Sequence, residues 1–172
     1  MALVVFLRAV NVGGRTLRAR ALADELDLVN VGAAGTFVAP RAADAKALER
    51  AIRRKLPFES EVFVCAGKEI LRLVRSEPFG AAEPEKGVKR TISVLARPPR
   101  PRPKLPIERP QGPSWEVRVV QIVGRHALCE RRRLGARLIY PNEVVEKGLG
   151  IAATTRGWDT LLAICRILEE VR

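Results

Sequence analysis

A glycine-containing loop flanked by arginines, near the start of the chain, is the first group of residues that could bind a ligand. Asn11-Val12-Gly13-Gly14 stands between Arg8 and Arg15. Two successive glycines can take positive φ, so the backbone N–H groups could form an anion-binding nest. The loop has neither the Lys-Ser/Thr of a P-loop nor the three-glycine spacing of a dinucleotide-binding turn. We predict a site for a small phosphorylated or carboxylated ligand at Arg8, Asn11, Gly13, Gly14 and Arg15; the alternative is a tight turn and nothing more.

A second group lies near the other end of the chain, where Arg156 stands between two threonines and Trp158. A helix is expected to begin there, and an arginine at a helix N-terminus can hold an anion through two parallel hydrogen bonds. We predict ligand binding by Thr155, Arg156 and Trp158. In the alternative, Thr155 caps the helix, Trp158 packs, and Arg156 pairs with a carboxylate such as Asp159. A single small-ligand site would require the two groups to share one pocket.

Other reactive residues give no recognisable catalytic pattern. Cys65, Cys129 and Cys165 are odd in number and share no short spacing, and His126 has no carboxylate or cysteine at motif distance. No paired carboxylates, no Ser-His or Cys-His spacing and no metal-ligand cluster accompany Arg156. We therefore predict no cofactor and no metal, and the sequence leaves open whether the protein is an enzyme.

Charge is distributed unevenly along the chain. Residues 1–86 hold 14 basic and 11 acidic side chains, a net of +3, whereas residues 87–172 hold 17 basic and 8 acidic, a net of +9. Residues 89–137 alone carry 13 basic against 3 acidic side chains. Such an excess predicts a partner that is a nucleic acid or another polyanion if the charges share a face. The alternative is a compositional bias, since 24 of the 31 basic residues are arginine.

The predicted nucleic-acid contacts come from a proline-rich stretch and from the densest basic cluster. Residues 97–113 contain seven prolines, which forbid a helix or a sheet interior and predict an extended, solvated segment. The candidate contacts are Arg97, Arg100, Arg102, Lys104, Arg131, Arg132 and Arg133. With eight aromatic residues in the chain, contact would be mainly with phosphate.

The elements that must position these groups can be read from apolar periodicity. The apolar run 3–7 predicts a strand buried on both faces and central to a sheet. In the first half we predict helices at 19–26, 44–56 and 67–76, a glycine-bearing strand at 28–40 and a strand at 61–65. In the second half we predict a strand at 88–95, a hairpin at 115–131, an extended piece at 134–140 and helices at 143–147 and 158–171. Residues 77–87 are rich in proline, glycine and glutamate, which is typical of a linker.

The two groups of residues described first also carry a family resemblance. Leu7-Arg8-Ala9-Val10-Asn11-Val12-Gly13-Gly14-Arg15 and Thr154-Thr155-Arg156-Gly157-Trp158-Asp159-Thr160 resemble the bacterial family named domain of unknown function 1697. The order and spacing fit essentially the whole chain. The resemblance implies an α+β fold of two ferredoxin-like subdomains in tandem, at 1–86 and 87–172, with mainly antiparallel or mixed sheets and helices on one face. It implies no activity, cofactor or substrate.

The chain departs from the family pattern at two places. Ala34-Gly35-Thr36 replaces a typical serine-glycine-asparagine, and Arg156-Gly157-Trp158-Asp159 replaces arginine-asparagine-tryptophan-asparagine. Polar side chains that could do chemistry are therefore missing, which leaves open whether this chain would keep any enzymatic activity of the family.

Our leading hypothesis is a small non-catalytic protein that binds an anionic partner, nucleic acid first, through its basic second half. The alternatives are an enzyme or small-ligand protein at the arginine and glycine groups, and a protein-interaction module. No apolar run approaches the roughly 20 residues needed to cross a bilayer, and the N-terminus has no signal-peptide pattern. We therefore expect a cytoplasmic protein without membrane partners; the sequence does not specify its oligomeric state.

Overall fold

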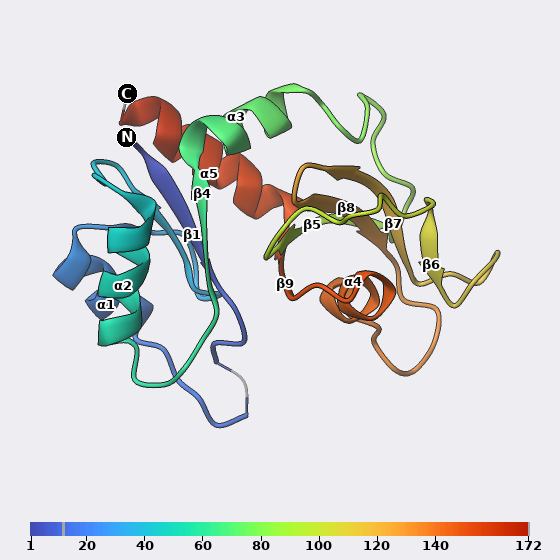
Figure 1. The fold of residues 1–172 in the computed structure, drawn as a ribbon. Coiled ribbons are helices and arrows are strands. Elements are labelled where there is room, and N and C mark those ends of the chain that lie inside the picture. Colours follow the sequence, from blue (N-terminus) through green and yellow to red (C-terminus); the bar gives the residue numbers. More distant parts are fainter. Residues whose placement is uncertain (12, 172) are drawn as a thin grey trace. The chain divides into compact units, whose positions relative to one another are not determined.

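The computed structural model describes residues 1–11 and 13–171, which form an α+β protein with two antiparallel sheets (Figure 1). The chain divides into two compact units. The first contains Met1–Ser76 and Asp159–Arg172, and the second contains Glu77–Trp158. Each unit has its own sheet, of four and five strands respectively. No helix in the part of the chain that the structure describes is long and apolar enough to cross a membrane.

The sheet of the first unit is built around β1 (Leu3–Leu7), whose five residues are all buried. The strand order is β2-β3-β1-β4, and β1 pairs antiparallel with β3 (Thr36–Ala39) and β4 (Val62–Ala66). A continuous apolar run with no polar alternation is suited to such a central position. The prediction of a central strand buried on both faces agrees with the structure.

Two helices pack on one face of this sheet. They are α1 (Ala19–Leu26) and α2 (Ala45–Lys55), and their apolar sides join the β1 side chains in one core (Figure 1). The Asp44 carboxylate accepts the backbone N–H of Ala47 at 2.8 Å, which is the N-cap that the sequence predicts.

The sequence predicts a single strand over 28–40, and this is wrong. The stretch forms a hairpin of β2 (Val29–Asn30) and β3, closed by the Val31 N–H donating to the Thr36 carbonyl at 2.8 Å. Gly32 and Gly35 take φ of +81° and +70°, so they turn the chain and do not continue it. Gly35 is also closely packed, since a Cβ at this position would lie 2.9 Å from the Leu7 Cβ.

The last helix belongs to the first unit almost entirely. In α5 (Trp158–Glu170), the Leu168 side chain approaches Gly67 at the start of α3 (Gly67–Arg75), where an added Cβ would lie 2.8 Å from it. Arg75 and Glu169 form an exposed ion pair at 2.8 Å. The boundary between the units therefore differs from the predicted halves, because this apolar helix packs back on the first unit.

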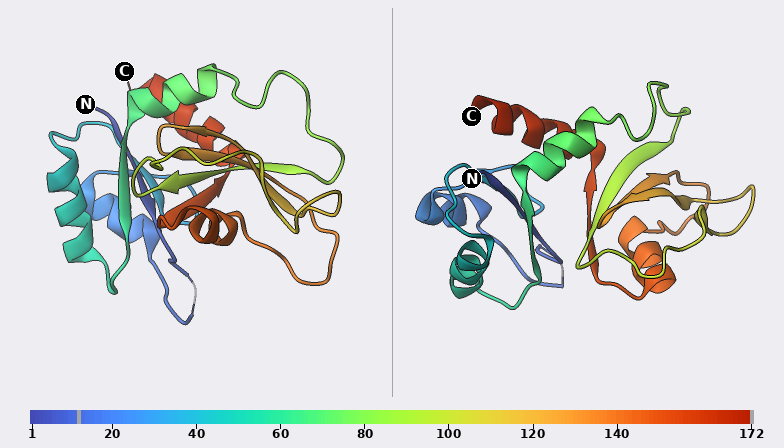
Figure 2. Two further views of the ribbon diagram at one scale, coloured as in Figure 1. Left: turned by 45° about the vertical axis from the view of Figure 1, so that its right-hand side comes forward. Right: turned by 45° about the horizontal axis from the view of Figure 1, so that its top comes forward.

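The second unit is a sheet with one helix on one face. The strand order is β6-β7-β8-β5-β9, with β5 (Lys89–Leu95) between β8 (His126–Arg131) and β9 (Ala153–Gly157). Helix α4 (Pro141–Leu149) packs on the core of this unit through Val145 and Leu149 (Figure 2). Pro141 occupies the first turn of α4, and Gly150 ends it with φ +64°.

Three segments of this unit refine the sequence expectations. Within the proline-rich stretch, β6 (Ile107–Arg109) pairs with β7 (Val117–Val123) at the sheet edge, where neighbouring prolines are tolerated. The sequence predicts only that Thr154-Thr155-Arg156-Gly157 leads into the last helix. Residues 153–157 form the strand β9, since they pair with β5 along their whole length. Residues 134–140 form no strand; the loop begins with backbone N–H groups bound to Glu116.

Candidate functional site

The predicted N-terminal loop is held in place by Asn11. Its Nδ2 donates to the Ala33 carbonyl at 2.7 Å, and its Oδ1 accepts the Leu17 N–H at 2.8 Å. Asn11 thus ties the loop to the β2–β3 turn on one side and to the start of α1 on the other. Both ends of its amide serve the fold, so Asn11 positions the loop. Val12 lies outside the described residues.

The backbone of this loop is unusual because several residues take positive φ. The values are +53° at Ala9, +59° at Asn11, +59° at Gly13 and +81° at Gly14. The two glycines are exposed, and a Cβ at either would meet nothing within 4 Å. The expected glycine conformation is therefore present, and the anion-binding nest stays a prediction. Left-handed backbone at Ala9 is costly for a residue with a Cβ and marks a loop that its surroundings hold in shape.

The two arginines of the loop contact the connection between α2 and β4. The Arg8 Nη1 lies 3.0 Å from the Glu61 carboxylate, and the Ser60 hydroxyl donates to the Arg8 carbonyl at 2.6 Å. The Arg15 guanidinium lies 5.3 Å from the centre of the Phe58 ring and donates to the Glu59 carbonyl at 3.3 Å. The structure thus brings Arg8 and Arg15 to one connection in the first unit.

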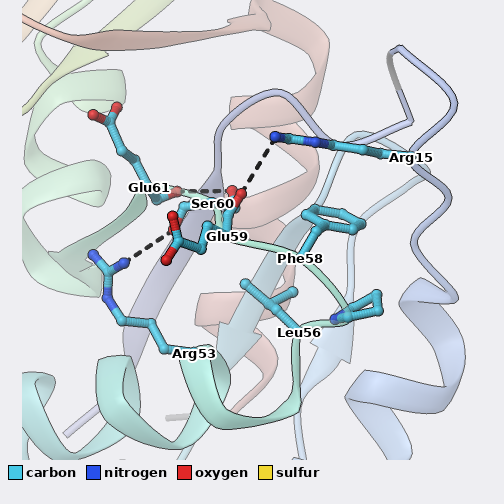
Figure 3. A pocket seen from close by; sticks show the side chains of 8 residues that line it. Arg15, Arg53, Leu56, Phe58, Glu59, Ser60 and Glu61 are labelled. Carbon is cyan, nitrogen blue, oxygen red and sulfur yellow. Dashed lines mark hydrogen bonds between the residues drawn. The ribbon is translucent and has the colours of Figure 1, made fainter.

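An open cleft of about 770 Å³ lies along this connection (Figure 3). It is lined by Arg15, by Arg53 and by residues 56–61. Arg53, in the last turn of α2, donates to the Ser60 carbonyl at 3.0 Å and pairs with Glu49 at 2.9 Å. Neither Arg53 nor the stretch 56–61 is among the site residues that the sequence predicts, so sequence reasoning misses this cleft. The feature of the sequence that could have indicated the cleft is the apolar stretch Leu56-Pro57-Phe58, which is followed by Glu59 and Glu61.

Arg156 lies in β9 and is only 7% exposed. Its Nη1 donates to the Thr154 hydroxyl at 2.8 Å and to the Thr155 carbonyl at 2.9 Å. Burial lowers the pKa of the Arg156 guanidinium to about 10, which still leaves it charged at neutral pH. Arg156 belongs to the second unit, whereas Arg8 belongs to the first.

The expectation that Thr155 caps the final helix is wrong. Thr155 is within β9, and its hydroxyl shares a 2.7 Å hydrogen bond with Ser93 of the neighbouring strand β5. The helix begins three residues later at Trp158, whose ring packs edge to face on Phe79 with centroids 5.1 Å apart. The packing role of Trp158 in the alternative prediction agrees with this contact.

The predicted nucleic-acid contacts fall into two groups. Arg97, Arg100, Arg102 and Lys104 are exposed in the stretch between β5 and β6. In the cluster at 131–133, Arg131 and Arg132 are half-buried and Arg133 is exposed.

Within that cluster, Arg132 donates to the carbonyls of Trp115 and Pro113 at 2.7 and 2.5 Å. Arg133 donates to the carbonyls of Gly135 and Ala136 at 3.3 and 2.7 Å, and Arg131 is half-buried in β8. Arg132 and Arg133 therefore brace the loop after β8.

The aromatic rings next to this region are occupied by arginines. The Trp115 ring has Arg118 at 4.1 Å and Arg132 at 4.0 Å from its centre, and only 6% of Trp115 is exposed. Arg90 lies 5.1 Å from the centre of Phe79. These contacts stabilise the unit through cation–π attraction and leave the rings little surface for stacking on a base.

All three carboxylates between residues 89 and 137 are bound internally. Glu108 accepts the Gly112 N–H at 3.1 Å, and Glu130 pairs with Arg118 at 2.6 Å. Glu116 accepts two N–H groups, from Leu134 at 2.9 Å and from Gly135 at 3.1 Å. These two hydrogen bonds hold the pKa of Glu116 below its ordinary value. Each of the three carboxylates is therefore already engaged by a group of its own unit.

The three cysteines and the single histidine are buried within the fold. Among residues 1–11 and 13–171, no group of three His, Cys, Asp or Glu side chains could hold a metal ion. The three cysteines are buried and take part in no disulfide within the same residues. Burial raises the pKa of the Cys129 thiol to about 12, so this thiol is protonated and unreactive at neutral pH.

Comparison with known protein families identifies a match that covers more than half of the chain. The family described as "Protein of unknown function (DUF1697)" matches residues 1–123, and the chain belongs to this family. The predicted resemblance is confirmed, and the match contains the first of the two motifs that suggested it; the second lies beyond residue 123. No curated protein and no solved structure matches the chain.

Proposed function

We propose that this DUF1697 protein is a non-catalytic binding protein that holds a polyanion, nucleic acid foremost, on the exposed cations of its second unit. One observation carries the proposal: the three carboxylates of residues 89–137 are bound internally, whereas eight of the thirteen basic side chains are exposed. Those eight are Lys89, Arg97, Arg100, Arg102, Lys104, Arg109, Arg133 and Arg137. An excess of exposed positive charge at a surface attracts phosphate groups.

Hydrogen bonds link the two segments that carry most of these exposed cations, the proline-rich stretch 97–113 and the loop that follows β8. The Glu116 N–H donates to the Arg109 carbonyl at 2.9 Å, and the Glu116 carboxylate binds the loop that follows Arg133. Arg132 in turn reaches the carbonyl of Pro113 at the end of the proline-rich stretch. These contacts support a shared surface, because they tie the loop after β8 to the segment that carries Arg109.

The enclosed aromatic rings decide the mode of binding. Trp115 is held by Arg118 and Arg132, so stacking on bases would require these contacts to break. Contact with phosphate needs no such change. The proposed binding is therefore weakly specific and strongly dependent on salt.

We propose further that both units have the ferredoxin-like topology. In the first unit the chain order β-α-β-β-α-β and the sheet order β4-β1-β3-β2 support this. In the second unit the corresponding order is β9-β5-β8-β7. In the second unit, residues 96–116, with the edge strand β6, would then replace the first helix of the ferredoxin-like order. The exposed cations of this stretch would therefore lie on a connection that the fold does not require to have one particular structure. We expect the protein to act in the cytoplasm.

The test is a binding titration with a fluorescent single-stranded RNA of about 20 nucleotides at salt concentrations from about 50 to 200 mM. In the test variant Arg97, Arg100, Arg102 and Lys104 are all changed to glutamine. The matched control changes four exposed cations of the first unit, Arg41, Lys46, Arg50 and Arg54, in the same way. Both variants have the same net charge, so a difference between them reports the location of the surface.

We expect the log–log salt slope of the test variant to be smaller by about 0.7 for each phosphate that its side chains no longer neutralise, hence by up to about 3. The control should keep a slope close to that of the unchanged protein. Equal weakening in both variants, binding that ignores salt, or no binding at about 50 mM salt would each refute the proposal.

A further inference from the structure

The cleft of the first unit is separate from the proposed polyanion surface, which belongs to the second unit. Its volume of about 770 Å³ lies within the range of small-molecule sites. Figure 3 shows Arg15 and Arg53 approaching the connection 58–61 from opposite sides. What the cleft could bind is decided by which of its charges are already neutralised.

Two of the four charged side chains that line the cleft have ion-pair partners. Glu61 pairs with Arg8 at 3.0 Å, and Arg53 pairs with Glu49 at 2.9 Å. The other two are Arg15 and Glu59. Within the described part of the chain neither of these forms an ion pair. Arg15 donates one hydrogen bond, a long one of 3.3 Å to the Glu59 carbonyl, and keeps its other N–H donors for a ligand.

These two charges restrict the ligand more than the arginines alone would suggest. A doubly charged phosphate would gain from Arg15 but would be repelled by the Glu59 carboxylate. A ligand with one carboxylate and one ammonium group satisfies both, because guanidinium binds carboxylate as a fork and carboxylate accepts from ammonium.

The rest of the lining supplies an apolar surface. Leu56 and Phe58 are half-buried, Pro57 is exposed beside them, and the Phe58 ring lies under the Arg15 guanidinium. An aliphatic or aromatic side chain of a ligand would cover this surface and be removed from water itself.

We infer that this cleft binds a small zwitterion with an apolar side chain, with its carboxylate on Arg15, its ammonium group on Glu59 and its side chain on Leu56, Pro57 and Phe58. Two sources share this chemistry: a free α-amino acid and a short peptide with free ends. The groups of a dipeptide lie farther apart than those of an amino acid, so the two can be told apart by titration.

The experiment is an NMR titration of the full chain with leucine and with the dipeptide Leu-Leu, each up to about 10 mM. N-acetyl-leucine and leucine amide serve as ligands that lack one charge. We expect shifts at residues 56–61 with at least one of the two zwitterions, and weaker binding of both blocked compounds. The zwitterion that binds more tightly identifies the source.

Two variants assign the ends of the ligand. Arg15→Gln should weaken the zwitterion roughly three- to tenfold and leave the amide unaffected, whereas Glu59→Gln should weaken the zwitterion equally and leave the N-acetyl compound unaffected. Arg20→Gln and Asp24→Asn are the controls, since both residues are exposed on α1 away from the lining. All four substitutions are at exposed positions outside the hydrophobic core, so the variants are expected to fold.

Three outcomes overturn the inference: neither zwitterion binds at about 10 mM, the blocked compounds bind as tightly as the zwitterions, or the cleft variants behave like their controls. No nucleic acid is present in the titration. A failure of the polyanion proposal therefore leaves this result unchanged, and the reverse also holds.

Discussion

Gly35→Ala tests whether the N-terminal loop is set in place by a close backbone approach. Gly35 is buried at the start of β3, and its carbonyl accepts the Leu7 N–H at 2.8 Å. A Cβ at this position would lie 2.9 Å from the Leu7 Cβ and 3.0 Å from Val10 Cγ2. Leu7 and Val10 are the residues that lead into the loop, so the added methyl group presses directly on its base.

Two costs add in this variant. The backbone has φ +70°, and a left-handed conformation costs a residue with a Cβ about 1–2 kcal/mol. Overpacking a core that cannot shift costs a further 1–3 kcal/mol, roughly. We therefore expect Gly35→Ala to lower the free energy of unfolding of the first unit by about 2–5 kcal/mol, a large part of the ordinary stability of a domain.

Gly32→Ala is the matched control. Gly32 has φ +81° in the same turn, but a Cβ there would meet nothing within 4 Å. It should therefore cost about 1–2 kcal/mol from the backbone alone. The difference between the two variants isolates the close approach from the conformational strain.

The assay is urea unfolding followed by circular dichroism, with amide hydrogen exchange of β1 as a readout confined to the first unit. With a slope of about 2 kcal/mol/M, the expected destabilisation moves the urea midpoint by about 1–2.5 M for Gly35→Ala and by about 0.5–1 M for Gly32→Ala. Equal midpoints for the two variants would show that Leu7 and Val10 do not enclose Gly35.

Two further predictions concern residues that hold loops in place. Asn11→Ala removes two hydrogen bonds and places alanine at φ +59°, so it should lower the free energy of unfolding in urea by about 2 kcal/mol. The control Asn30→Ala, in β2, should cost well under half of that. Similar midpoints for the two variants would argue against the role of Asn11 in holding the loop. Glu116 has a lowered pKa, so its stabilising effect is complete above its ordinary pKa and is lost as the pH falls through the lower folded value. Glu116→Gln should therefore reduce the loss of stability at acid pH, measured as the urea midpoint between about pH 3 and pH 7. Parallel curves for the variant and the unchanged protein would contradict the stabilising role of the Glu116 carboxylate.

Much of the local structure could be predicted from the sequence because the signals were local. The apolar run 3–7, the Asp44 cap with the stripe that follows it, and the hairpin turn at Gly124-Arg125 depend on residues within a few positions of one another. The same holds for the positive φ at Gly13 and Gly14. The sequence did not predict β9, because Thr154-Thr155-Arg156 has no strand signal strong enough by itself. Pairing with β5, about 60 residues earlier, makes it a strand.

The candidate sites depended on tertiary structure for another reason. The sequence determined that residues 89–137 carry an excess of positive charge and that arginines flank a glycine loop. Only the fold decided which charges are available, because Glu108, Glu116 and Glu130 find internal partners, Arg132 turns onto Trp115, and Arg156 is buried in a strand. Composition fixes how many charges a chain has, whereas hydrogen bonds and ion pairs between distant residues determine which of them remain for a ligand.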